Sequence, residues 1–121
     1  MTREVGVNLQ RLGGNARYSQ CVISADRIET AGIVARDLRQ DIGAQTRDVL
    51  QQLEDILAMA KVDKSHLTRV QIWLADMADF DAMNAVYDAW VDQQNPPARA
   101  CVGAALADSR YRLEIQACAV S

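Results

Sequence analysis

Three side chains near the end of the chain have types and spacing suited to anion binding or acid–base chemistry. Arg99 and Cys101 are two residues apart, and Glu114 lies in the next extended stretch. Residues i and i+2 of a strand share a face, so Arg99 and Cys101 point one way and Val102 the other. If Val102 faces a helix-covered core and the two stretches form a hairpin, then Arg99, Cys101 and Glu114 line one uncovered surface. The pattern predicts either an anion site with an acid–base group or a salt bridge between subunits.

The sequence offers little for other kinds of catalysis. His66 is the single histidine and lies in a predicted turn, so any Ser-His-Asp or Cys-His arrangement would depend wholly on it. The three cysteines are far apart and odd in number, which indicates reduced thiols and neither a disulfide framework nor a zinc site. Asp76 and Asp79 bracket a predicted helix start, where capping and turn formation explain them.

The elements that must position these residues follow from the apolar periodicity. Helices are expected over residues 41–61, where apolar residues recur at helical spacing, and 79–91, which Pro96 and Pro97 bring to an end. Alternation and short apolar runs predict six strands, over residues 6–12, 18–24, 27–35, 70–75, 98–107 and 111–120. The aromatic side chains at strand or helix spacing are expected to pack in the core, namely Trp73, Phe80, Tyr87 and Trp90.

This order of elements indicates one α+β domain over residues 1–121. Strands separated by helices predict crossover connections in a mixed sheet, with both helices on one face. Tight turns are expected at residues 25–26 and 108–110. The other face of the sheet would then be bare, and a partner chain is the simplest cover for it.

Composition and charge narrow the class of protein. Half of the 121 residues are hydrophobic and 24% are charged, as in an ordinary globular protein. The formal net charge is -3 and no basic run occurs, which makes nucleic acid an unlikely partner by the usual electrostatic footprint. No stretch is apolar enough to span a bilayer, and residues 1–5 lack the apolar core of a signal peptide, so we expect a cytoplasmic protein.

Several segments resemble the RidA/YjgF family, in the same order along nearly the whole chain. The C-terminal segments, 97–102 and Leu113-Glu114-Ile115, look like the family's signature. The other matching segments are Tyr18-Ser19-Gln20, Thr30-Ala31-Gly32, Gln45-Thr46-Arg47, Asp79-Phe80, Met83-Asn84 and Tyr87.

The resemblance implies a chorismate-mutase-like fold and a homotrimer, a trimeric barrel with three clefts between its subunits. It implies hydrolysis of reactive 2-imino or enamine acids to 2-ketoacids and ammonia, with no metal and no organic cofactor. The family's carboxylate-binding arginine falls on Arg99 and its water-positioning glutamate on Glu114. The remaining cleft positions fall on Cys101, Tyr18, Gly32 and Asn84.

This sequence departs from the family pattern at three positions. Ala31 stands where many members have serine, Gln116 where many have a second glutamate, and Arg17 where proline is common. Such changes are typical of a divergent branch, and two other functions stay open. One is a non-catalytic small-molecule binder or regulator in the same clefts, and the other is RNA cleavage or translation inhibition. Arg99 and Glu114 favour the deaminase over the first, and the charge distribution weighs against the second.

Overall fold

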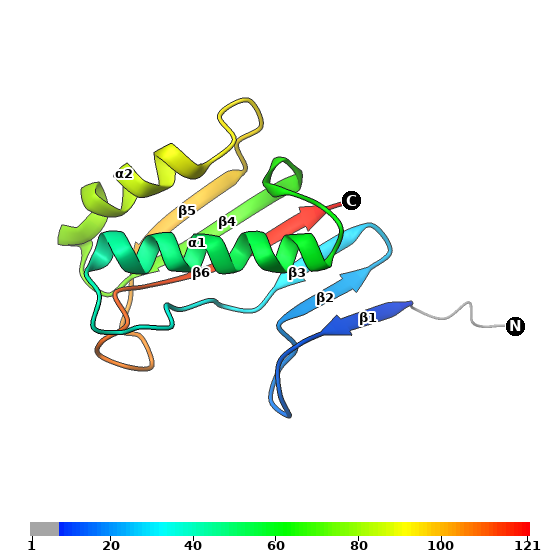
Figure 1. The fold of residues 1–121 in the computed structure, drawn as a ribbon, viewed down its shortest axis with the longest axis horizontal. Helices are drawn as coiled ribbons and strands as arrows, with labels where there is room; N and C mark the ends of the chain where they lie inside the picture. The colour runs from blue at the N-terminus through cyan, green and yellow to red at the C-terminus, as the bar shows by residue number, and fades with distance from the viewer. Residues whose placement is uncertain (1–7) are drawn as a thin grey trace, which may run out of the picture.

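A six-stranded mixed sheet carries both helices on one face in the computed structural model, which describes residues 8–121 (Figure 1). The strands lie side by side in the order β1-β2-β3-β6-β4-β5. Their bounds are β1 Leu9–Leu12, β2 Cys21–Ser24, β3 Arg27–Thr30, β4 Leu67–Leu74, β5 Ala98–Gly103 and β6 Leu113–Val120. The helices are α1 Ile42–Met59 and α2 Phe80–Trp90, with short 3-10 turns η1 Lys64–His66 and η2 Met77–Asp79. The predicted α+β class and the placement of the helices are confirmed.

The first three strands form an antiparallel meander. The predicted turn between β2 and β3 is present, and Ala25 adopts a left-handed conformation with φ of 55° there. The strand predicted over 27–35 ends at Thr30, after which only an isolated bridge joins Ile33 to Ile115. At the end of β3 the Thr30 hydroxyl accepts the Ala117 amide hydrogen at 3.0 Å, and the Thr30 carbonyl accepts a hydrogen from the Gln116 side chain at 3.1 Å. Residues 6 and 7 of the first predicted strand lie outside the described residues.

The core lies between α1 and the middle of the sheet. The apolar stripe of α1 includes Val49, Leu53 and Ile56, each exposed by 1% or less. It packs on alternate residues of the central strands, such as Ile72 and Ile115, which are fully buried. Asp41 caps the helix, because its side chain accepts the Ala44 amide hydrogen at 2.9 Å. No helix in the described part of the chain is long and apolar enough to cross a membrane.

The last two strands do not form the hairpin that the sequence suggested. β4 lies between them, parallel to β5 and antiparallel to β6. The chain runs from β4 through α2 to β5 as a crossover, and residues 104–112 then carry it past the end of β4. Both edges of β4 are therefore hydrogen-bonded to a neighbouring strand, and β5 forms the edge of the sheet.

The neighbours of β5 also reverse the predicted direction of its side chains. Arg99 pairs with Val70 and Cys101 with Ile72, and paired residues of parallel strands share a face. Val70 and Ile72 are fully buried beneath the helices. Arg99 and Cys101 therefore face the helix side, and Val102, which is 46% exposed, faces the uncovered side.

Candidate functional site

The helix α2 and the edge strand β5 bring Arg99, Asn84 and Tyr87 together. The Arg99 Nη1 donates a hydrogen bond to the Asn84 Oδ1 at 2.8 Å. The guanidinium carbon lies 4.7 Å from the centre of the Tyr87 ring, which places the cation over the ring. Asn84 and Tyr87 are three residues apart on α2, so both project from the same side of the helix. The guanidinium is thus held by two neutral groups at the edge of the sheet.

Cys101 follows Arg99 on the same face of β5 and is half-buried against the core. Burial raises the pKa of the Cys101 thiol, and the positive charge of Arg99 lowers it by less. The thiol is therefore protonated at neutral pH, which makes it a poor nucleophile. This environment fits an apolar wall for a bound ligand.

Glu114 occupies the opposite, uncovered face of the sheet. It pairs with Trp73 of β4, whereas its neighbours Leu113 and Ile115 are fully buried beneath the helices. The predicted direction of Glu114 is therefore correct. Trp73 also faces the uncovered side and is half-buried there, so its expected place in the core is wrong.

Gly32 lies directly against the Glu114 carboxylate. A Cβ atom at this position would come within 2.0 Å of the Glu114 Oε2, far inside van der Waals contact. Only glycine allows the carboxylate to lie on the backbone of this segment. In residues 8–121 the Glu114 carboxylate has no hydrogen-bond or ion-pair partner, which leaves its oxygens able to accept from a ligand or water.

Tyr18 lies in the loop between β1 and β2, which the Ala31 amide joins by donating to the Gln20 carbonyl at 2.9 Å. Tyr18 is 51% exposed, and its carbonyl accepts the Asn15 amide hydrogen at 3.0 Å. Gly14, at φ of 88°, passes so close that a Cβ atom there would lie 2.0 Å from the Tyr18 carbonyl oxygen. The six predicted site residues are therefore not gathered in one place within one chain, because Arg99 and Glu114 are on opposite faces of the sheet.

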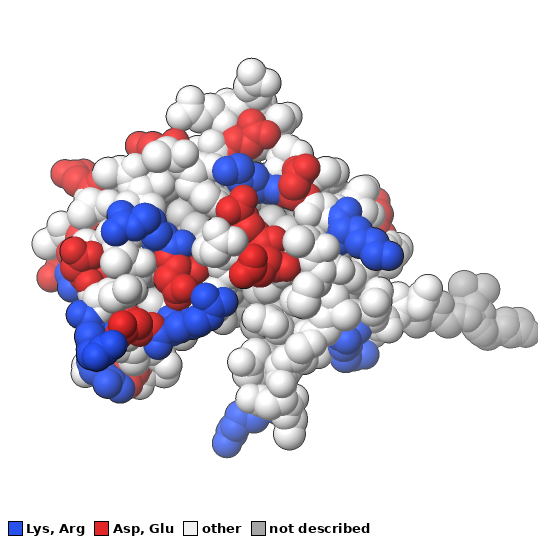
Figure 2. All heavy atoms as spheres, in the orientation of Figure 1, with Lys and Arg blue, Asp and Glu red and all other residues white. Residues whose placement is uncertain are grey.

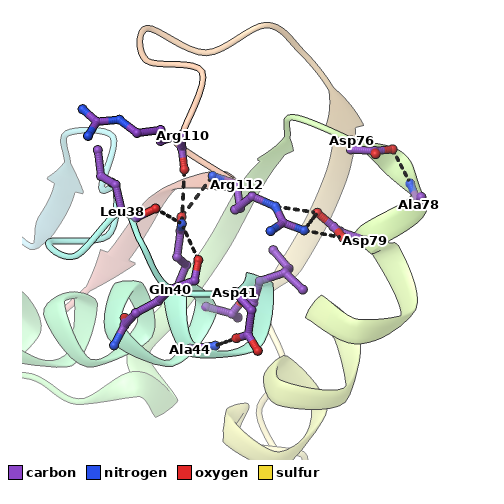
Figure 3. Close-up of polar contacts among 12 residues, drawn as sticks. Leu38, Gln40, Asp41, Ala44, Asp76, Ala78, Asp79, Arg110 and Arg112 are labelled. Atoms are coloured by element: carbon purple, nitrogen blue, oxygen red, sulfur yellow. Dashed lines mark hydrogen bonds and ion pairs between the residues drawn. The ribbon is translucent and has the colours of Figure 1, made fainter.

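A buried polar network holds the segment that leads into β6 (Figure 3). Gln45 is fully buried, and its amide donates to the carbonyls of Gln40 at 3.0 Å and Arg110 at 3.2 Å. Its Oε1 accepts the Arg112 amide hydrogen at 3.0 Å. The Arg112 guanidinium forms a two-pronged ion pair with Asp79, with contacts of 2.9–3.1 Å. The network fixes Arg112, which directly precedes β6 and lies two residues before Glu114.

The ion pair also corrects the expected role of Asp79. Its side chain makes no capping bond at the start of α2 and binds Arg112 instead. Asp76 does cap, since it accepts the Ala78 amide hydrogen at 2.9 Å at η2. Sequence reasoning missed the Gln45 network and the contact of Tyr87 with Arg99. The (i, i+3) spacing of Asn84 and Tyr87 was the signal available for the second of these.

A groove of about 640 Å³ between α1 and α2 contains none of the predicted site residues. Its walls include Glu54, Lys64 and Trp90, and the Trp90 indole N–H is buried there without a hydrogen-bond partner in residues 8–121. The Lys64 ammonium lies 5.1 Å from the centre of the Trp90 ring and 4.0 Å from the Glu54 carboxylate. Within residues 8–121, no group of three or more His, Cys, Asp or Glu side chains is placed to hold a metal ion.

Comparison with known proteins supplies the family context. The family model described as Endoribonuclease L-PSP matches residues 8–121. A RutC family protein from Haemophilus influenzae is 37% identical over 110 residues, covering 90% of this chain and 95% of that protein. A 2-iminobutanoate/2-iminopropanoate deaminase from Salmonella typhimurium is 29% identical over 110 residues, covering 85% and 86%. The crystal structure of a YjgF family member from Neisseria meningitidis matches with a TM-score of 0.92 at 39% identity, covering 95% of this chain and 96% of that one.

Proposed function

This chain belongs to the RidA/YjgF family, and we propose that it hydrolyses 2-imino or enamine acids to 2-ketoacids and ammonia. The named deaminase from Salmonella typhimurium supports this reaction class, while the Haemophilus influenzae relative carries only a family name. We place the reaction in clefts between the subunits of a homotrimer in the cytoplasm, without a metal or organic cofactor. Its substrate is a small imine or enamine with a carboxylate.

The observation that carries the proposal is the environment of Arg99. Some arginines of the chain, such as Arg36 and Arg112, pair with a carboxylate at 2.9 Å, and others, such as Arg47 and Arg69, have neither an ion pair nor a neutral partner that orients them in residues 8–121. Arg99 has no carboxylate partner in residues 8–121 and contacts only the neutral Asn84 and Tyr87. One of its five N–H groups is used by Asn84, so the rest can meet a ligand. An oriented cation with its charge uncompensated is suited to binding a substrate carboxylate.

The positions of Arg99 and Glu114 support a site made by two subunits. Within one chain they lie on opposite faces of the sheet, so they cannot meet around one small substrate. In a ring of identical chains, the Arg99 edge of one subunit can meet the Glu114 face of the next at every interface. The same association covers the bare sheet face.

The chemistry asks for orientation more than for a strong base. The imine carbon is already electrophilic, so a water molecule held at Glu114 can attack it. The water oxygen bonds to that carbon, its two protons pass to the imine nitrogen, and the carbon–nitrogen bond breaks to release ammonia. Glu114 moves the proton between the water and the departing nitrogen. Arg99 holds the carboxylate throughout, and Cys101 and Tyr18 form walls of the cleft.

Release of 2-ketoacid and ammonia from freshly generated 2-iminobutanoate tests the proposal. The imine can be produced in the cuvette by an amino-acid oxidase, and the wild-type protein should accelerate its decay. Glu114→Gln and Arg99→Ala should each remove most of that acceleration, while Gln51→Ala on the exposed side of α1 should not. A folded wild-type protein without any acceleration would rule out the deaminase. Tight ketoacid binding without turnover would instead favour the non-catalytic binder.

The charge distribution gives no support to RNA cleavage. On the helix-bearing face, Lys and Arg side chains are interspersed with Asp and Glu (Figure 2). Ion pairs such as Arg110 with Asp108, at 2.8 Å, neutralise several of these cations. A protein surface that binds the phosphate backbone of RNA needs clustered positive charge that nearby carboxylates do not neutralise.

A further inference from the structure

We propose that Tyr87 is a positioning residue for substrate binding, because its ring fixes the plane in which Arg99 presents its guanidinium. The inference rests on the proposed function, and it goes beyond the core-packing role that the spacing of Tyr87 predicts. It concerns how the chain holds its carboxylate-binding group before the substrate arrives.

The Arg99 guanidinium lies over the ring of Tyr87. The Arg99 guanidinium carbon is 4.7 Å from the Tyr87 ring centre, within the range of a cation–π interaction. The Arg99 side chain itself is exposed and starts from an edge strand, so the backbone leaves it several rotamers. The Tyr87 ring against the guanidinium and the Asn84 oxygen at 2.8 Å remove most of that freedom.

The Tyr87 ring is a rigid platform beneath the guanidinium, because it is held by the core. Tyr87 is 5% exposed, and its ring packs against Trp90 with a centre-to-centre distance of 5.9 Å. A ring wedged between the core and the guanidinium cannot move away when a ligand binds. A platform of this kind lowers the entropy that Arg99 loses when it forms a two-pronged pair with a carboxylate.

The positive charge of Arg99 also acts on the phenol of Tyr87. Burial raises the pKa of the Tyr87 phenol, and the positive charge of Arg99 partly offsets the rise. Removing that charge should raise the phenol pKa further. The phenol pKa therefore reports the contact independently of any activity.

Pyruvate, a small 2-ketoacid, is the probe for the decisive experiment. Its binding can be followed by the NMR signal of the Arg99 Nε–H group in the assembled protein. We expect Tyr87→Leu to weaken pyruvate binding by about 3- to 30-fold, the range of a cation–π contact between exposed and desolvated sites. Tyr87→Phe keeps the ring and should restore binding to within about threefold of the wild type. The Arg99 signal should lose its ring-current shift in Tyr87→Leu and keep it in Tyr87→Phe.

Val86→Ala is the matched control on the same helix, half-buried and next to Tyr87 in sequence. It should lower the midpoint of thermal unfolding without changing pyruvate affinity. If Tyr87→Leu fails to fold, the phenol pKa of Tyr87 in Arg99→Ala, measured with ¹³C-labelled tyrosine, decides the matter. A phenol pKa that does not rise would overturn the contact.

The outcomes separate this proposal from the deaminase. Wild-type affinity in Tyr87→Leu, or equal losses in Tyr87→Leu and Tyr87→Phe, would overturn the positioning role. If the wild-type protein binds pyruvate but does not hydrolyse 2-iminobutanoate, the deaminase is ruled out, and weaker pyruvate binding in Tyr87→Leu than in Tyr87→Phe still supports the positioning role. A kcat decrease at unchanged KM in Tyr87→Leu would also contradict the proposal, since positioning of the carboxylate group acts first on substrate binding.

Discussion

The guanidinium of Arg99 offers a planar fork that matches a carboxylate, which a lysine ammonium cannot copy. In the isolated chain this fork is exposed at the edge of the sheet, with Asn84 and Tyr87 behind it. In the proposed cleft the neighbouring subunit excludes water from it, and a substrate carboxylate then replaces that water. The Arg99 guanidinium is therefore exposed to water in the isolated chain and shielded from water in the proposed cleft.

Arg99→Ala should lower kcat/KM on the order of 30-fold or more, because truncating one partner of a buried charge pair costs about 2–5 kcal/mol. Arg99→Lys should recover only part of the loss. The assembly should survive, since the side chain points into an open cleft. Steady-state kinetics with 2-iminobutanoate measures the effect. Full activity in a folded Arg99→Ala protein would refute the carboxylate role, and collapse of the assembly would indicate an intersubunit salt bridge.

Cys101→Ala should keep most of the activity. The thiol has a raised pKa from burial and no histidine beside it, because His66 lies in η1 and bonds with Asp63. Its reaction with iodoacetamide at neutral pH should likewise be slow. An activity loss as large as that of Glu114→Gln would show that Cys101 takes part in the chemistry.

At the scale of elements, the start of β6 depends on a side chain of α1. Gln45 joins the loop before α1 to the segment before β6, through contacts separated by 65 and 67 residues in sequence. Arg112 and Asp79 extend the connection to the start of α2. The network holds Glu114 in register without any contact to it.

Gln45→Leu should lower the free energy of unfolding by about 3 kcal/mol, because it leaves the Arg112 amide and several carbonyls buried without partners. Gln51→Leu is the matched control on the same helix, since Gln51 is exposed and bonds only with Asp55. Its effect should stay within about 0.5 kcal/mol. Urea unfolding at equal protein concentration measures both. Equal effects of the two substitutions would show that the network contributes nothing specific.

At the scale of the whole molecule, the two charged groups of the site lie on opposite faces of one sheet. A closed ring of three chains would bring them together three times and cover the bare sheet face. Analytical ultracentrifugation at micromolar concentration should therefore give the mass of a trimer. A stable monomer would remove the proposed site, which needs two subunits.

Mixing inactive variants tests the shared site directly. If each cleft uses Arg99 from one chain and Glu114 from the next, every mixed trimer of Arg99→Ala and Glu114→Gln contains one intact cleft. An equal mixture that has exchanged subunits should regain about one quarter of the wild-type activity. Arg99→Ala mixed with the double variant Arg99→Ala/Glu114→Gln should regain none. The absence of recovery in exchanged trimers would rule out a site shared between Arg99 of one chain and Glu114 of the next.

Local patterns of residue type are enough to predict the elements and several side-chain directions. The stripe of α1 and the alternation of Leu113, Glu114 and Ile115 are local patterns, in which large apolar residues mark the buried face. The turn at Ala25 is equally local. The family signature indicated the site residues, although their roles stay predictions.

Which strands are neighbours, and hence which face carries Arg99, depends on the packing of the whole sheet. The strand β5 has mostly small residues, so its own alternation does not distinguish a buried from an open face. Its direction is set by β4, whose strongly apolar Val70 and Ile72 pair with Arg99 and Cys101 across the crossover. Pairing of this kind joins distant segments, and its free energy comes from the packing of the whole sheet against the helices. No local pattern in residues 98–103 contains that information.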